Sequence, residues 1–208
     1  MPRYLPGILA MAAIVVASNV LVQFLILDGL LTWGAFSYPL AFLVTDVMNR
    51  VYGAGPARRV VLAGFATGVV CSLIGSQIIG EFGPLVPLRV AVGSGIAFLT
   101  AQLLDVSIFN RLREGRWWRA PLVSTLVGSA VDTALFFTIA FAGFISLGAA
   151  ADAHVAWAQV PAPLLTFGPE MPLWITLALA DWGVKLGVAL LALVPFRLIV
   201  QKMRPGLV

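Results

Sequence analysis

A few ionisable side chains stand inside long apolar runs of the sequence, where each costs about 2.5 to 3.5 kcal/mol to place in a lipid core. Asp181 and Lys185 are four residues apart, in the order that favours an ion pair along one helix, and Asp46 and Arg50 repeat that spacing. Either pair is compatible with a purely structural role. Asp132 has no partner within its own run, so we expect it to meet a donor on another segment, take up a proton or contact a ligand.

Aromatic and amide side chains accompany these charges. Phe42 shares a helical face with Asp46, and Phe136 shares one with Asp132, while Asn19 stands in the first apolar run. A carboxylate beside an aromatic ring suits a flat heterocycle with N–H donors, because the ring stacks and the acid accepts hydrogen bonds from a guanine-like edge. Ordinary packing also places a Phe one turn from many residues, since 11% of the chain is aromatic.

The amino-acid composition excludes a water-soluble fold for this protein. The 208 residues are 61% hydrophobic and 11% charged, whereas soluble domains have roughly 45 to 50% and about 25%. The mean hydropathy of +1.01 is typical of membrane spans. Cys71 is the single cysteine of the sequence, which allows no intrachain disulfide and no cysteine-rich metal site.

Six apolar runs are long enough for helices that cross a hydrocarbon core of about 30 Å. They cover residues 5–27, 33–49, 59–79, 87–110, 120–144 and 172–200. We therefore predict an all-α membrane protein, a six-transmembrane-helix bundle that forms a single domain over residues 1–208. At about 1.5 Å per residue, Asp46, Asp132 and Lys185 each fall near the middle of the bilayer, and Asn19 lies at a similar depth.

The basic residues predict the orientation of this bundle, because Arg and Lys near helix ends stay on the cytoplasmic side. With six spans, one face carries eleven of them: Arg3, Arg50, Arg58, Arg59, Arg111, Arg113, Arg116, Arg119, Arg197, Lys202 and Arg204. Arg89 stands opposite, beside Asp28, Glu81, Asp152 and Glu170. We expect both termini to be cytoplasmic, and this bias explains the Arg-rich segment 111–119 without a nucleic-acid partner.

Pairs of small residues four apart predict close helix packing. They are Ala13 and Ala17, Gly64 and Gly68, Ala91 and Gly95, Ser124 and Gly128, and Gly183 and Gly187. Packing inside one bundle is the expected use, and a homodimer through such faces is the alternative. Residues 146–171, rich in Gly, Ala and Pro, are expected to form an outer loop.

Four segments together resemble the queuosine precursor transporter family, six-span bacterial inner-membrane proteins of the vitamin-uptake-like group. The segments are YPLAFLVTDVMNRVYG from Tyr38, QLLDVSIFNRLR from Gln102, WWRAPLVSTLVGSAVDTALFF from Trp117, and DWGVK from Asp181. The resemblance covers roughly residues 33–200. Its matched positions include the unusual intramembrane ones: Pro39, Phe42, Asp46, Arg50, Asp105, Asn110, Arg111, Asp132 and Lys185.

The resemblance implies a multi-pass protein of the bacterial cytoplasmic membrane that imports 7-cyano-7-deazaguanine, and 7-aminomethyl-7-deazaguanine as a second candidate, for queuosine salvage. No cofactor or metal is implied. We expect the base to contact Asn19, Phe42, Asp46, Asp132, Asp181 and Lys185. Transport is expected to proceed by alternating access around this midplane site. A second group is expected to serve coupling, gating or ion pairing: Arg50, Arg89, Asp105, Asn110 and Phe136.

Two other functions compete with this one. Ala13 and Ala17 resemble the contact that a substrate-capture subunit of an energy-coupling-factor transporter offers its scaffold. An intramembrane aspartyl enzyme is the remote alternative, but the Gly-x-Gly-Asp pattern is absent, as are HExxH and GxSxG. We therefore expect no catalytic residues.

Overall fold

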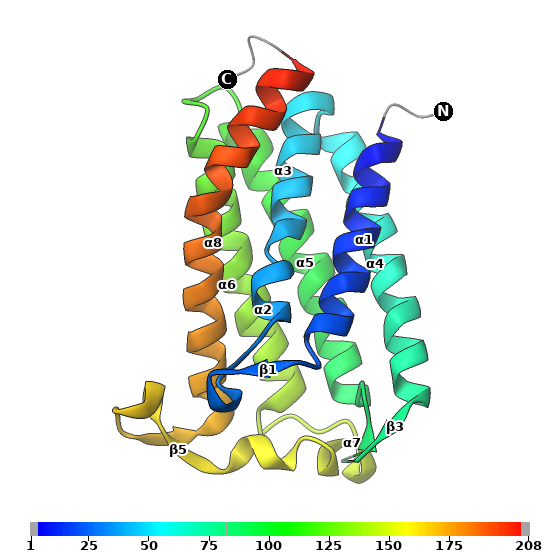
Figure 1. Ribbon diagram of the computed structural model, residues 1–208, viewed down its shortest axis with the longest axis vertical. Helices are drawn as coiled ribbons and strands as arrows, with labels where there is room; N and C mark the ends of the chain where they lie inside the picture. The colour runs from blue at the N-terminus through cyan, green and yellow to red at the C-terminus, as the bar shows by residue number, and fades with distance from the viewer. Residues whose placement is uncertain (1–3, 82, 205–208) are drawn as a thin grey trace.

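The computed structural model describes residues 4–81 and 83–204, and its main helices run side by side along one axis (Figure 1). They are α1 (Leu5–Leu21), α3 (Leu40–Tyr52), α4 (Ala54–Gln77), α5 (Leu88–Leu112), α6 (Arg119–Phe141) and α8 (Leu173–Met203). Two short helices, α2 (Gly34–Ser37) and α7 (Ala149–Ala153), lie in the connections. Among the described helices, α4, α5, α6 and α8 are long and apolar enough to cross a membrane, and α1 is a shorter apolar helix.

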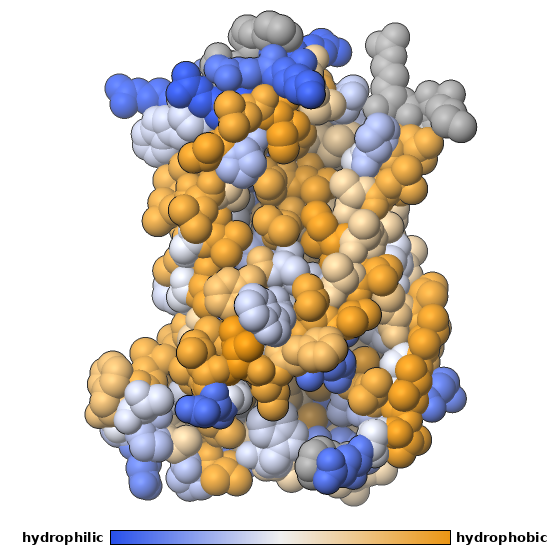
Figure 2. All heavy atoms as spheres, viewed as in Figure 1, coloured by the Kyte–Doolittle hydropathy of each residue, from blue (hydrophilic) through white to orange (hydrophobic). Residues whose placement is uncertain are grey.

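The surface supports a membrane setting for this bundle. Apolar residues cover most of its middle, whereas hydrophilic residues gather at the two ends (Figure 2). Large apolar side chains such as Leu73 on α4 and Leu191 on α8 are 62% and 75% exposed. Water would penalise so much exposed apolar surface, but lipid tails do not. The protein is a multi-pass membrane protein.

Two of the predicted segments have different ends in the structure. The first helix stops at Leu21 rather than at residue 27, because the chain turns there into a short hairpin of β1 (Leu25–Ile26) and β2 (Leu31–Thr32). The helix predicted from residue 59 begins at Ala54. Gly53, with φ of 92°, allows the chain to leave α3 and enter α4 at once.

The second predicted segment is broken rather than continuous. It consists of α2 and α3, which are separated at Tyr38 and Pro39. Proline lacks the N–H that would continue the helical hydrogen bonds, so the helix is interrupted at this point. The break places Tyr38 deep in the bundle, where its ring packs edge-on against Phe98 of α5.

Three antiparallel hairpins lie at one end of the bundle, here called the hairpin end (Figure 1). Besides β1 and β2, they are β3 (Ile79–Gly80) with β4 (Gly83–Pro84), and β5 (Pro161–Pro163) with β6 (Glu170–Pro172). The expected outer loop 146–171 is therefore structured, with α7 and β5 inside it. At the opposite end, α1 begins and α8 ends; we call this the basic end for its residues Arg58, Arg59, Arg113, Arg119, Arg197 and Lys202. Arg3 lies outside the described residues.

The small-residue pairs divide between the inside and the outside of the bundle. A Cβ added at Gly64 would meet Met11 at 2.5 Å, and one added at Gly128 would meet Phe42 at 2.8 Å, so these two positions allow close packing. Gly183 and Gly187 face open space, and Ala13 and Ala17 are exposed. A homodimer through these exposed faces stays a prediction.

Candidate functional site

The centre of the site is Lys185 of α8, held between two carboxylates. Its Nζ lies 2.7 Å from Oδ2 of Asp132 on α6 and 2.6 Å from Oδ2 of Asp181, one turn earlier on α8. The predicted pair of Asp181 and Lys185 therefore forms. Asp132 meets its donor on another helix, the first of the three expected outcomes. Two carboxyl groups therefore share one lysine.

Hydroxyl groups complete the cluster. The Tyr38 hydroxyl donates to Asp132 Oδ1 at 3.2 Å, and Lys185 Nζ lies 5.6 Å from the centre of the Tyr38 ring. Thr133 receives a hydrogen bond from Lys185 at 2.9 Å and donates to Asp181 Oδ2 at 3.0 Å. Asp132 and Lys185 are each 3% exposed, so this network replaces the water that both charges lack.

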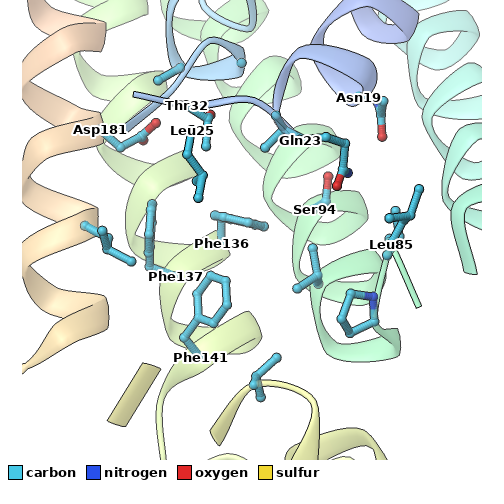
Figure 3. Close-up of a pocket in the computed structure, with 18 of the residues that line it drawn as sticks. Asn19, Gln23, Leu25, Thr32, Leu85, Ser94, Phe136, Phe137, Phe141 and Asp181 are labelled. Carbon is cyan, nitrogen blue, oxygen red and sulfur yellow. The ribbon is translucent and has the colours of Figure 1, made fainter. Parts of the chain in front are cut away.

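Asp181 differs from Asp132 in having room for another partner. Its side chain is 16% exposed, against 4% for Asp132. Both hydrogen-bonding contacts described for Asp181 use Oδ2, and a carboxylate has about four acceptor positions. Figure 3 shows the carboxylate extending from α8 toward the centre of the pocket. Asp181 is thus the acid of the cluster that is best placed to meet a ligand.

A cavity of about 500 Å³ extends from this cluster to the hairpin end. Typical ligand sites enclose roughly 300 to 1,000 Å³. Polar side chains from several elements line it besides the cluster, namely Ser18, Asn19, Gln23, Thr32, Ser72, Glu81, Ser94 and His154. The rim includes Leu25 of β1 and Trp157 of the α7–β5 connection, which are 67% and 51% exposed.

Aromatic rings form one wall of the cavity. Phe136, Phe137 and Phe141 project from the last turns of α6 into the space in front of Asp181 (Figure 3). Phe136 and Phe141 meet edge to face with centroids 5.8 Å apart, and Trp157 packs against Phe141 at 5.5 Å. A flat ligand between this wall and the acid cluster would have both apolar faces and hydrogen-bond partners.

The cavity brings together five of the residues expected from the sequence and leaves out the others. Asn19, Asp132, Phe136, Asp181 and Lys185 line it. Phe42 and Asp46 do not, although both were expected to contact a substrate: they are 1% and 3% exposed and lie in the half of the bundle toward the basic end. Asn110 is exposed near the end of α5.

Asp46 belongs to a second, closed polar cluster between α3, α5 and α6. The hydroxyls of Ser124 and Thr125 donate to its two oxygens at 3.2 and 3.0 Å. Asp105 of α5 is fully buried in the same cluster, since its Cβ lies 3.4 Å from the position of a Cβ at Gly128, one turn from Ser124 on α6. Its carboxylate oxygens receive no hydrogen bond from the described residues. Gln102 of α5 accepts a hydrogen bond from Thr45 at 2.6 Å.

Arg50 does not form the ion pair with Asp46 that their spacing predicts. Its guanidinium instead donates to the carbonyl of Arg113 at 2.6 Å and to that of Trp117 at 3.2 Å, and it lies over the Phe109 ring. Arg113 in return donates to the Arg50 carbonyl at 2.7 Å. The carbonyls at the α5–α6 turn lack helical partners, so an arginine satisfies them.

Arg89 of α5 connects the end of α6 with α7 at the hairpin end. It is 3% exposed and donates to the carbonyls of Ile139 and Ala142 at the end of α6. It also pairs with Asp152 of α7 at 3.3 Å. The Ser146 hydroxyl, joined by the Leu147 amide and Arg89, holds the pKa of Asp152 below its usual range.

Several lining residues escape prediction from the sequence. Tyr38 is the first residue of the segment YPLAFLVTDVMNRVYG. Its position before Pro39 inside an apolar run is the signal that could have identified it as a lining residue. Thr133 follows Asp132 directly, but a threonine inside a helix has many structural uses. Trp157 lies in the long loop, where no periodicity points to a cavity.

The comparison with known families decides the identity of this bundle. The family model described as "Putative vitamin uptake transporter" matches residues 32–200. The chain belongs to this family of transporters. The match begins at β2 and ends in α8, and so includes every charged residue of both polar clusters.

Individual relatives agree with the family. The chain is 43% identical over 141 residues to a queuosine precursor transporter of Escherichia coli, which is 62% of this chain and 64% of the relative. It is 37% identical over 121 residues to a probable queuosine precursor transporter of Haemophilus influenzae, 53% of this chain and 52% of the relative. A third, from Bacillus subtilis, is 29% identical over 195 residues, 84% of this chain and 73% of the relative.

The chain therefore matches less than two thirds of the length of the first two relatives. No solved structure shows a significant match to it.

Proposed function

We propose that this family member imports a queuosine precursor, 7-cyano-7-deazaguanine or 7-aminomethyl-7-deazaguanine, across a bacterial cytoplasmic membrane. The observation that carries the proposal is the acid–lysine cluster facing an aromatic wall in one cavity. The names of the relatives supply the cargo class. A cavity of about 500 Å³ is large enough for such a bicyclic base with some bound water.

The cavity suggests how the base is held. A guanine-type edge presents adjacent N–H donors and a carbonyl. The free acceptor positions of Asp181 suit the donors, and the amides of Asn19 or Gln23 suit the carbonyl. Phe136 and Phe137 offer ring faces for the heterocycle. Lys185 and Asp132 position Asp181 and complete the polar floor of the cavity.

We further propose that the bundle crosses the bilayer six times, with α2 and α3 together forming the second crossing. The support is that α1 begins and α8 ends at the same end of the bundle (Figure 1). Arginines concentrate at that end, whereas Arg89 is buried in contacts at the other. The positive-inside rule makes the basic end cytoplasmic and the hairpin end external.

In this orientation the described conformation presents the cargo cavity to the outside. The cavity reaches the hairpin end, while the cytoplasmic half is packed by Val47, Phe109, Phe196 and Val200. Import then requires these apolar contacts to separate as the hairpin end closes over the base, which is alternating access around a central site.

A ligand-specific stabilisation experiment tests the cargo. The purified protein is heated in detergent with 7-cyano-7-deazaguanine, with guanine and with adenine. We expect the deazaguanine to raise the unfolding temperature most, and the Asp181→Asn variant to lose that gain while Glu170→Gln, an exposed carboxylate at the same end, keeps it. Equal stabilisation by all three bases would contradict the proposed cargo.

A second candidate function is substrate capture for an energy-coupling-factor transporter. The observation that favours it is the exposure of Ala13 and Ala17 on α1, where a scaffold helix could pack closely. Co-purification with an ATPase pair, together with uptake that stops on ATP depletion while ion gradients are clamped, would support it. Uptake by the purified chain alone in liposomes would exclude it.

A further inference from the structure

The closed cluster of Asp46 and Asp105 has no part in the cargo cavity, yet it contains two buried acids. Asp46 is 3% exposed and Asp105 is 0% exposed. Ser124 and Thr125 satisfy Asp46, whereas neither oxygen of Asp105 receives a hydrogen bond from the described residues. A buried carboxylate without any donor is costly, so Asp105 needs a partner that the described side chains do not supply.

The charges around the cluster do not fill this need. Arg50 lies one turn along α3 from Asp46, but its guanidinium is bonded to the carbonyls of Arg113 and Trp117. Lys185 on α8 is engaged by Asp132 and Asp181. The α8 residues that line the small void beside Asp46 are apolar, namely Ala189, Ala192, Leu193 and Phe196. Other basic groups toward this end include Arg111 on α5, Arg119 on α6, and Arg197, which stacks on Trp117.

The size of the cluster limits what can bind there. The void beside Asp46 measures about 10 Å³, at the lower limit of the roughly 10 to 15 Å³ that a single water molecule requires. The described residues also bring no third acid, histidine or cysteine to these two acids, so they do not form a metal-binding group. A proton needs no volume, and one proton between two adjacent carboxylates removes the repulsion between them.

We propose that Asp46 and Asp105 share a proton and form the coupling-ion site of this transporter, separate from the cargo cavity. In the described conformation the proton lies between the two carboxyl groups. Asp105 then donates to Asp46, whose negative charge is stabilised by hydrogen bonds from the Ser124 and Thr125 hydroxyls. The proton is taken up from the external side before α3, α5 and α6 close around the two acids, and it is released to the cytoplasm when these helices separate.

Helix α6 links this site to the cargo cavity. It carries Thr125, which bonds Asp46, and Asp132, which bonds Lys185. The separation of seven positions corresponds to about 10 Å along the helix. A tilt of α6 that opens the cytoplasmic half therefore moves both sites together. This coupling role depends on the proposed import function, whereas the shared proton does not.

Infrared spectroscopy tests the shared proton without any cargo. The carbonyl stretch of a protonated carboxyl group is resolved from the bands of a carboxylate. We expect the purified protein at neutral pH to show this stretch, Glu114→Gln to retain it, and Asp105→Asn to lose it, because Asp46 then ionises while it keeps its two hydroxyl donors. Absence of the band in the unsubstituted protein, or its persistence in Asp105→Asn, overturns the proposal.

Transport in liposomes tests the coupling. With an internal pH dye, addition of 7-cyano-7-deazaguanine is expected to acidify the lumen of liposomes that contain the unsubstituted protein or Glu114→Gln. Asp105→Asn is expected to bind the base normally but to lose accumulation driven by an inward proton gradient. Cargo uptake without proton entry, or uptake driven by sodium at clamped pH, overturns the coupling role. Failure to bind the base at all, with the infrared band present, overturns the proposed cargo and leaves the proton site standing.

Discussion

Lys185 of α8 lies 2.7 Å from Asp132 of α6, and this contact joins two of the helices that line the cavity. Both side chains are almost fully buried. Breaking a buried pair by removing one partner is far more costly than replacing both, because the remaining charge stays without compensation. Single and double substitutions of this pair are therefore expected to differ in their effect on the stability of the protein.

Replacing Lys185 by Met is expected to destabilise the protein by about 3 to 5 kcal/mol, since Asp132 and Asp181 then face each other without a cation. The double variant Lys185→Met with Asp132→Asn should recover most of that loss. Thermal unfolding in detergent measures both, with Lys202→Met at an exposed position as the control. A double variant as unstable as the single one would show that the pair is not energetically coupled.

Replacing Asp181 by Asn is expected to weaken binding of 7-cyano-7-deazaguanine more than it weakens the fold. Lys185 keeps Asp132, so the polar floor remains paired. Hydrogen bonds to a charged group contribute about 1.5 to 3 kcal/mol, which corresponds to roughly 10-fold to 100-fold in affinity. Titration calorimetry gives the affinity, with Glu170→Gln as the matched control. An unchanged affinity would show that Asp181 does not contact the base.

The sequence anticipated the helices more reliably than the contacts between them. Apolar runs of sufficient length locate α4, α5, α6 and α8, because membrane helices must be long and apolar. The break at Pro39 was missed, although the proline itself is visible, because an apolar run does not reveal where its helix stops.

The candidate site shows the same division. The pair of Asp181 and Lys185 follows from helical spacing within one segment. The partner of Asp132 depends on which helices are neighbours, and no local pattern encodes that. Arg50 was assigned to Asp46 by the same spacing rule, but the carbonyls at the α5–α6 turn, which carry no side-chain signal, hold it instead.

Replacing Gly128 by Ala is expected to destabilise the bundle, because an added Cβ would lie 2.8 Å from Cε1 of Phe42. Phe42 is 1% exposed and has little room to move. Overpacking of this kind costs about 1 to 3 kcal/mol. Gly183→Ala is the matched control, since its Cβ meets nothing within 4 Å. Equal unfolding temperatures for the two variants would contradict close packing of α3 against α6.

The hairpin end is expected to loosen in acid because of Asp152. The Ser146 hydroxyl, the Leu147 amide and Arg89 hold the pKa of Asp152 below its unfolded value, which is about 3.9. A lowered pKa stabilises the folded segment fully above the unfolded value, and this stabilisation is lost as the pH falls through the folded pKa. The protection of residues 146–160 against hydrogen exchange, taken relative to the intrinsic rate at each pH, should therefore fall below about pH 4.

Two variants separate this effect from general acid unfolding. In Asp152→Asn, the amides of residues 146–160 should already have little protection at neutral pH. Acid should then cause no further loss of protection that depends on position 152. Asp28→Asn, an exposed acid at the same end for which the structure shows no ion pair among the described residues, should behave like the unsubstituted protein. If Asp152→Asn kept the slow exchange at neutral pH, the contacts of Asp152 with Ser146 and Arg89 would not be what holds α7 in place.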